Sequence, residues 1–128
     1  MTKPTSDHVG LSLRANEHKI HDLYLEPDGN LALVYRAEAV GQHARQRLMT
    51  YHAEWFLDTE VGVRWLDEIM AQRYNPALTE AVVKAEVINT SGIKDIVSFS
   101  VRFDLPMRKL KITEIQATTI YSDLVVTI

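Results

Sequence analysis

The sequence predicts a single small α+β domain with an N-terminal β-hairpin, about three helices and antiparallel strands at its C-terminal end. Three observations support this prediction. The 128 residues, 46% of them hydrophobic, suit one globular domain with its own core. Apolar residues recur at helical spacing in the middle of the chain and at every second position elsewhere. The chain has no cysteine, so packing must hold the fold without disulfide bonds or thiolate–metal sites.

The first strands are expected to follow a polar arm. Residues 1–20 are polar and unpatterned, which is typical of a flexible arm, and the folded domain is expected over 21–128. Leucines alternate with other residues over 23–25 and again over 31–33. The segment 27–30, Pro-Asp-Gly-Asn, has the composition of a β-turn. Together these segments predict a β-hairpin.

The spacing of apolar residues predicts the first two helices. The first is expected over 37–52, where one stripe consists of Val40, Ala44, Leu48 and Tyr51. Gly41 inside this helix costs about 1 kcal/mol relative to alanine, which indicates close packing there. The second helix is expected from about residue 60 to 73. Its apolar face consists of Trp65, Leu66, Ile69 and Met70.

The third helix is predicted mainly from its two ends. Asn75 followed by Pro76 is typical of a helix start, because the first caps the helix and the second suits its first turn. Ser91-Gly92 is expected to end it, since glycine readily adopts the left-handed conformation of a helix end. The expected buried stripe consists of Leu78, Val82, Ala85 and Ile88.

Alternation of apolar and polar residues predicts strands in the last third of the chain. Over 97–105 it is strict, which predicts one buried and one solvated face. The apolar members are Val97, Phe99, Val101, Phe103 and Leu105. Pro106 then marks a strand end. Over 110–117 the apolar positions change from even to odd numbers, which predicts either a bulge near Thr113 or two strands. A turn at 121–123 and a final strand over 124–128 follow.

Composition and motifs argue against several functions. The net charge of −3 disfavours a nucleic-acid binder. No apolar run approaches the ~18 residues of a membrane span, and no signal peptide is evident, so a soluble intracellular protein is expected. No phosphate-binding loop or nucleophile elbow occurs. No metal or cofactor is expected, because His18 and His21 lack a third ligand and His52-Ala53-Glu54 lacks the cysteines of a zinc deaminase.

Four charged residues leave two questions open. Glu54 and Asp58 flank an aromatic pair, and an apolar neighbour can raise the pKa of a carboxyl group enough to make a general acid. Alternatively, Glu54 closes a salt bridge or caps a helix. Arg47 adjoins the apolar stripe, so it is either partly buried and paired, with Glu54 as the nearby candidate, or solvated together with Arg45.

Three short motifs lie close together in the first half of the chain. They are Val40-Gly41-Gln42, Arg45-Gln46-Arg47-Leu48 and Glu54-Trp55-Phe56-Leu57-Asp58. This ordered set resembles the baseplate wedge, or sheath-initiator, family of contractile tails, some members of which carry the label "tail lysozyme". The resemblance extends over about residues 22–128. Relatives usually have glycine at the position of Ala53 and proline at that of Arg64.

The resemblance implies a structural protein of a phage tail baseplate, or of a tail-like bacteriocin or type VI secretion baseplate, without enzymatic activity. The alternative is a small muramidase that uses Glu54 and Asp58. Implied partners are other wedge or hub proteins and sheath or tail subunits, with about six copies in a sixfold particle. Neither nucleic acid nor membrane is implied. The implied location is the virion baseplate, after assembly in the host bacterial cytoplasm.

Two sets of contact residues follow from the resemblance. The first is the loop through which wedge subunits grip one another, and it consists of Arg45, Arg47, Glu54, Trp55 and Asp58. The second is a C-terminal strand edge that faces the sheath, and it consists of Leu124, Val125, Val126, Thr127 and Ile128. An unpaired strand edge offers backbone hydrogen bonds to an incoming strand. These last five residues are expected to contribute little to the chain's own core.

Overall fold

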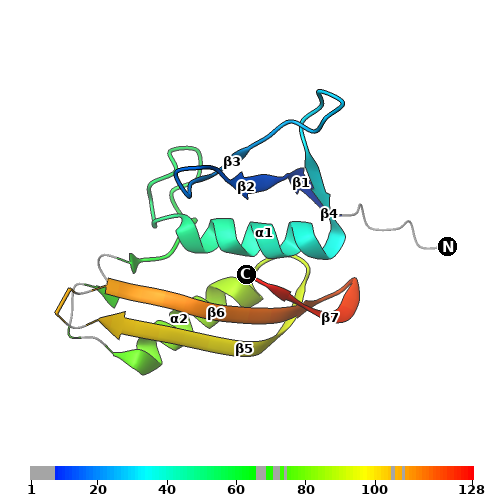
Figure 1. The fold of residues 1–128 in the computed structure, drawn as a ribbon. Helices are drawn as coiled ribbons and strands as arrows, with labels where there is room; N and C mark the ends of the chain where they lie inside the picture. Colours follow the sequence, from blue (N-terminus) through cyan, green and yellow to red (C-terminus); the bar gives the residue numbers. More distant parts are fainter. Residues whose placement is uncertain (1–7, 66–68, 71–72, 74, 105, 108) are drawn as a thin grey trace.

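A computed structural model describes residues 8–65, 69–70, 73, 75–104, 106–107 and 109–128. The elements are β1 (Val9–Leu11), β2 (Leu13–Ala15), β3 (His21–Leu23), β4 (Leu33–Tyr35), α1 (Arg36–Met49), α2 (Pro76–Ile88), β5 (Ile93–Asp104), β6 (Lys109–Thr119) and β7 (Ser122–Thr127). They form an α+β domain, as predicted (Figure 1). Its described part contains two α-helices instead of three.

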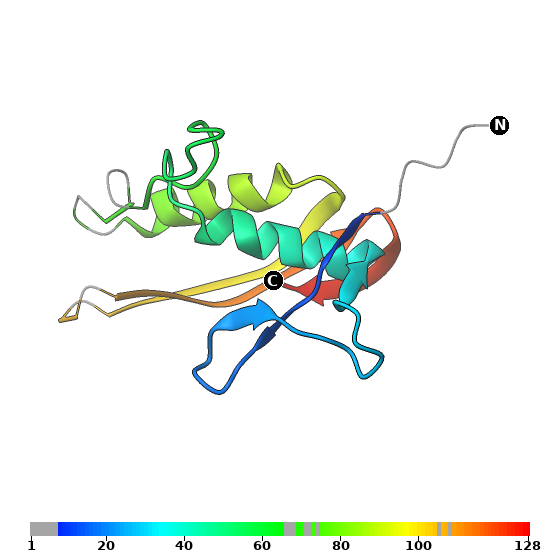
Figure 2. The ribbon, with the colours of Figure 1, turned by 90° about the horizontal axis from the view of Figure 1, so that it is seen from above.

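An antiparallel sheet in the order β5-β6-β7 forms one layer, and α1 and α2 lie over it (Figure 2). The core lies between these layers. Its buried members are Leu48, Val63, Ile69, Val83, Val87 and Ile115. Helix α1 also contacts a second layer formed by β1 and β4, where Val34 is buried. Helix α1 therefore lies between the large sheet and a small N-terminal ribbon.

The two long strands pair with three register shifts. One shift falls where Ser100 pairs with Glu114 and Val101 with Ile112, so Thr113 is the extra residue. The bulge predicted near Thr113 is therefore confirmed, and β6 continues through it. A second shift between Ile96 and Ser98 disturbs the alternation of β5. Val97 is consequently 58% exposed, so its predicted burial was wrong. Leu105 lies outside the described residues.

Helix α1 buries the face that its apolar spacing predicts. Val40, Ala44 and Leu48 are buried, but the helix ends at Met49, so Tyr51 lies beyond it and is exposed. The Trp65 indole N–H donates to the Leu48 carbonyl at 2.8 Å. This bond satisfies one of the carbonyl groups that a helix end leaves without a partner in its own last turn.

Helix α2 begins as predicted but buries a different stripe. The Asn75 side chain accepts a hydrogen bond from the Leu78 N–H at 3.2 Å, which confirms the predicted cap. The buried residues are Thr79, Val83 and Val87, one position out of step with the predicted stripe, because the adjacent valines allow either face to be apolar. The helix ends at Ile88, and Gly92 has its positive φ of 95° three residues after the cap at Asn89.

The helix predicted over 60–73 is wrong in its first part. Val63 forms an isolated parallel bridge with Tyr51, and residues 60–64 are not helical. Farther along, the Met70 N–H donates to the Trp65 carbonyl at 2.8 Å, five residues back, which is the spacing of a π-turn. Leu66 and the other residues of 66–68, as well as 71–72, lie outside the described part of the chain.

The N-terminal ribbon changes partners along its length. The predicted turn at 27–30 is present, with the Glu26 N–H donating to the Asn30 carbonyl at 2.8 Å, but only Leu25 and Leu31 pair across it. The flanking strands pair elsewhere: β4 with β1, and β3 with β2. Strands β1 and β2 fall within the range assigned to an arm, and residues 1–7 lie outside the described part. The division of the chain at residue 20 stays a prediction.

Candidate binding surfaces

Strand β7 ends the large sheet with one side open. It pairs with β6, and no described strand pairs with its other side. The Ile128 N–H donates to the Ile115 carbonyl at 2.9 Å, and Thr127 lies opposite Gln116. Hydrogen-bonded and non-hydrogen-bonded pairs alternate along an antiparallel ladder. The N–H and C=O groups of Thr127 therefore point away from β6, and the carbonyl oxygen lies beside α1, 3.9 Å from the Cβ position of Gly41.

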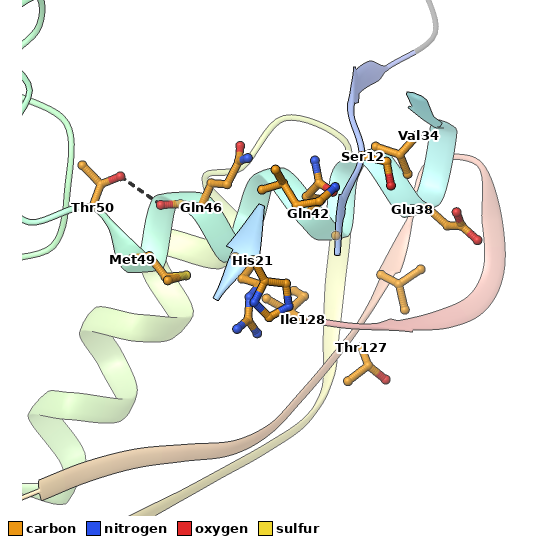
Figure 3. Close-up of a pocket in the computed structure, with 14 residues that line it drawn as sticks. Ser12, His21, Val34, Glu38, Gln42, Gln46, Met49, Thr50, Thr127 and Ile128 are labelled. Carbon is orange, nitrogen blue, oxygen red and sulfur yellow. Dashed lines mark hydrogen bonds between the residues drawn. The ribbon is translucent and has the colours of Figure 1, made fainter. Parts of the chain in front are cut away.

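This open edge borders a groove of about 690 Å³ (Figure 3). Helix α1 forms one wall, and β2 and β3 contribute Leu13 and His21. Val126 and Thr127 of β7 and the following Ile128 complete the lining on the other side. The groove therefore combines unused backbone groups with apolar side chains. An extended segment of another chain needs both to join a sheet.

Gly41 and Gln42 shape the wall that α1 presents to this groove. Gly41 is buried and faces β7, where a methyl group would lie 3.5 Å from Val126 Cγ2, an ordinary van der Waals contact. The Gln42 side chain accepts from the Leu13 N–H at 3.0 Å and donates to the Leu11 carbonyl at 2.7 Å. Both ends of this amide are thus used to hold β1 and β2 against the helix.

A second hollow, of about 800 Å³, adjoins the loop that follows α1. Arg47, Glu54 and Trp55 line it, whereas Arg45 lines the first groove. Residues two apart on an α-helix point in nearly opposite directions, about 200° apart, which explains the separation. Asp58 lines neither hollow. The structure thus brings together three of the five residues assigned to the core loop.

Arg47 is paired, but with a residue that the sequence analysis did not name. Its Nε donates to Glu86 Oε1 on α2 at 2.9 Å, and its Nη1 donates to the Asn89 carbonyl at 2.8 Å. Within the described chain, the pair considered between Arg47 and Glu54 is therefore not formed. The bond joins α1 to the end of α2, and 39 residues separate its partners in sequence.

A double-mutant cycle on Arg47 and Glu86 is expected to show coupling of about 0.5–1 kcal/mol in the free energy of unfolding. The Arg47 side chain is 41% exposed, so solvent screens the ion pair and keeps the coupling modest. Urea unfolding of Arg47→Ala, Glu86→Ala and the double variant measures it. The matched cycle with Glu54→Ala should show no coupling, and equal coupling in both cycles would contradict the assignment.

The two carboxylates of the muramidase alternative serve local turns. Glu54 Oε1 accepts from the Tyr51 N–H at 2.9 Å, and Asp58 Oδ1 accepts from the Glu60 N–H at 3.0 Å. Both residues are exposed. A carboxyl group that acts as a general acid at neutral pH needs an apolar enclosure that favours its protonated form. Neither carboxylate has such surroundings among the described residues.

The loop that follows α1 and borders the second hollow contains a residue with a strained backbone conformation. Ala53 has φ of 67°, in the left-handed region that glycine adopts without steric cost. The resemblance noted above places glycine at this position. The tight turn before Glu54 is therefore present here despite the substitution, and it leaves Trp55 about half exposed beside the hollow.

A cluster around His8 joins distant parts of the chain, and no local sequence pattern predicts it. The His8 N–H donates to the Tyr121 hydroxyl at 2.9 Å, and the ring Nε2 lies 2.9 Å from Ser91 Oγ. The ring centroid of His43 lies 6.4 Å from that of His8. Burial, and secondarily the nearby His8, lower the pKa of His43 below its ordinary value. The cluster secures β1 over the turn between β6 and β7.

These surfaces belong to a small α+β domain that has an unpaired strand edge and hollows beside it. Neither described helix has the length and hydropathy of a membrane span. The described residues contain no cluster of three or more histidine or acidic side chains that could hold a metal ion.

The chain belongs to the contractile injection system sheath initiator family, whose model matches residues 12–122. The predicted relationship to sheath initiators is thereby confirmed. The protein is a sheath initiator, a structural component of a contractile injection system baseplate, and its partners are sheath and baseplate components. A search of curated proteins finds no match.

Proposed function

We propose that the chain starts sheath assembly by strand addition at the open edge of β7. The observation that carries this proposal is the orientation of Thr127, a residue that lines the groove and whose backbone N–H and C=O groups point away from β6. A strand from a sheath subunit would pair with these groups and extend the sheet beyond β7. Backbone bonds would supply affinity, and alternate side chains in the groove would set the register.

We further propose that the second hollow receives a neighbouring wedge subunit. Arg47, Glu54 and Trp55 lie around it, and Trp55 offers a half-exposed aromatic surface of the kind enriched at binding hot spots. Asp58 is exposed in the same loop and would contact the neighbour at its rim. The ion pair with Glu86 would hold Arg47 in place before the neighbour arrives.

The assembly that we propose is a sixfold baseplate with about six copies of the chain. We place it in a contractile phage tail, assembled in the bacterial cytoplasm and carried in the virion. A tail-like bacteriocin or a secretion baseplate would use the same surfaces, since strand pairing and wedge contacts depend on the chain and not on the particle's cargo.

The experiment that tests strand addition replaces Thr127 with proline. Proline removes the N–H that points away from β6, while the ladder bond of Ile128 to β6 remains. We expect folded protein and complete baseplates without sheath, viewed by electron microscopy. Thr127→Val keeps the N–H and should support normal sheaths. Sheaths of normal length on baseplates that contain Thr127→Pro, shown to be folded by circular dichroism, would overturn the proposal.

Deletion of residues 124–128 would test strand docking less specifically than the sequence indicates, because it would also change the packing of the chain. The Ile128 side chain packs against the hydrophobic core, and Val126 packs against Gly41. The expectation that this segment contributes little to the core was therefore wrong for Ile128. By contrast, Leu124 is 79% exposed and Val125 is also exposed. A backbone substitution at Thr127 separates docking from stability better than truncation does.

A further inference from the structure

Arg45 is a charged residue of the β7 groove that forms no ion pair with any described residue. It lies on the exposed side of α1 and lines the groove near Gln46 and Met49. Among the described residues, no carboxylate forms an ion pair with it and no group hydrogen-bonds to its side chain. Arg47, two residues later, is held by Glu86 and Asn89. The two arginines of one motif are thus in opposite states, one paired and one unpaired.

The surroundings of Arg45 combine apolar side chains with polar ones, among them His21 and Gln46. Leu13, Met49, Val126 and Ile128 contribute carbon surface to the groove. Gln42 uses both ends of its amide on β1 and β2. The other charged group of the groove, Glu38, lies seven residues before Arg45, about 10 Å away along the helix axis. A positive charge therefore stands at one end of an apolar groove and a negative charge at the other.

We propose that Arg45 recognises an acidic side chain on the strand that docks beside β7. This inference rests on the proposed function, because it concerns the occupant of the same groove. The occupant is an extended segment of a sheath subunit with apolar side chains facing Val126 and an Asp or Glu facing Arg45. A guanidinium binds a carboxylate through two parallel hydrogen bonds, so the contact fixes the position of the strand as well as adding affinity.

A contact between Arg45 and an acidic side chain can fix the register of the docked strand, which backbone pairing alone does not fix. A strand shifted by one residue would turn its acidic side chain out of the groove, and a shift by two would move it about 7 Å along β7. Either shift leaves Arg45 unpaired beside apolar surface. Complementary charge thus discriminates between registers that have nearly the same number of backbone bonds.

Synthetic peptides provide the test. Three ten-residue peptides of alternating Thr and Val, with Glu, Gln or Lys at one central inward position, are titrated into the full chain and followed by fluorescence anisotropy. We expect the Glu peptide to bind about tenfold more tightly than the Gln peptide at low salt, with the difference shrinking at high salt. Arg45→Glu should reverse the order and favour the Lys peptide. Arg45→Lys should retain only part of the preference.

Arg102→Ala is the matched control, since it removes one positive charge from an exposed position of β5, away from the groove. It should leave the preference for Glu unchanged. Equal binding of the three peptides to the wild-type chain would overturn the role of Arg45 and leave strand addition intact. Absence of binding by all three, with Thr127→Pro supporting normal sheaths, would overturn both proposals.

Discussion

Replacement of Gly92 by alanine is expected to lower the free energy of unfolding by about 2–4 kcal/mol. Two causes add. Gly92 has φ of 95°, a conformation that alanine adopts only with strain. Its Cβ would also lie 2.6 Å from Val40 Cγ2 and 3.2 Å from the His8 ring, where α1 and β1 pack closely. Val40 is fully buried, so it has little room to move away.

Gly29→Ala provides the matched control. Gly29 has a similar φ of 86°, but no atom outside its immediate neighbours lies within 4 Å of the Cβ position. It should therefore show only the backbone cost, about 1 kcal/mol. Urea unfolding of both variants separates strain from overlap. Equal losses in the two variants would show that Val40 and His8 accommodate the methyl group, contrary to this expectation.

Replacement of Ile115 by alanine is expected to cost about 3–4 kcal/mol. Ile115 is 1% exposed and lies in the core between the sheet and both helices, so the lost methyl groups leave a cavity that rigid neighbours cannot fill. Thermal and urea unfolding measure the loss. Its backbone bond to Ile128 is retained, so β7 should stay in place.

Ile112→Ala makes the same chemical change on the same strand. Ile112 is only half-buried at the margin of the core, before the bulge at Thr113. The expected loss is about 1–2 kcal/mol, because water already reaches part of the side chain and fills the space. Comparable losses at the two positions would mean that the core extends past the bulge as tightly as it does at Ile115.

Features determined by neighbouring residues could be predicted from the sequence. The cap at Asn75 depends on the next few residues, and the stripe of Val40, Ala44 and Leu48 depends on one helix alone. The bulge at Thr113 appears in the sequence as a change of apolar phase, since a strand can shift its buried face only by inserting a residue. Each of these signals is complete within about a dozen residues.

Features that join distant segments could not be predicted in this way. The valines of α2 offer two possible stripes, and only packing against α1 and β5 selects the one with Val83 and Val87. Pairing of β1 with β4 brings together strands more than twenty residues apart, while the local turn at 27–30 suggested a simple hairpin. Strands of only three residues carry too little pattern to identify their partners.

The candidate site likewise has one part that the sequence could predict and one part that it could not. The motif that contains Arg45 and Arg47 indicated a contact region, and the resemblance implied one contact loop for both arginines. The two arginines point in nearly opposite directions from α1, so they line different hollows. Glu86, the partner of Arg47, lies on another helix. The sequence contains no local signal for a partner 39 residues away. The reassignment of Arg45 to the β7 groove therefore required the structure.

The hydrogen bonds of His8, which directly precedes β1, cannot form early during protein synthesis. The Tyr121 hydroxyl that holds His8 comes 113 residues later in the chain, and Ser91, the other partner, comes 83 residues later. While a growing chain leaves the ribosome, β1 can meet β4 and α1, but the turn between β6 and β7 does not yet exist. Strand β1 thus acquires its contacts in two stages: those with β4 and α1 while the first half of the chain emerges, and those of the adjacent His8 once Ser91 and Tyr121 are in place.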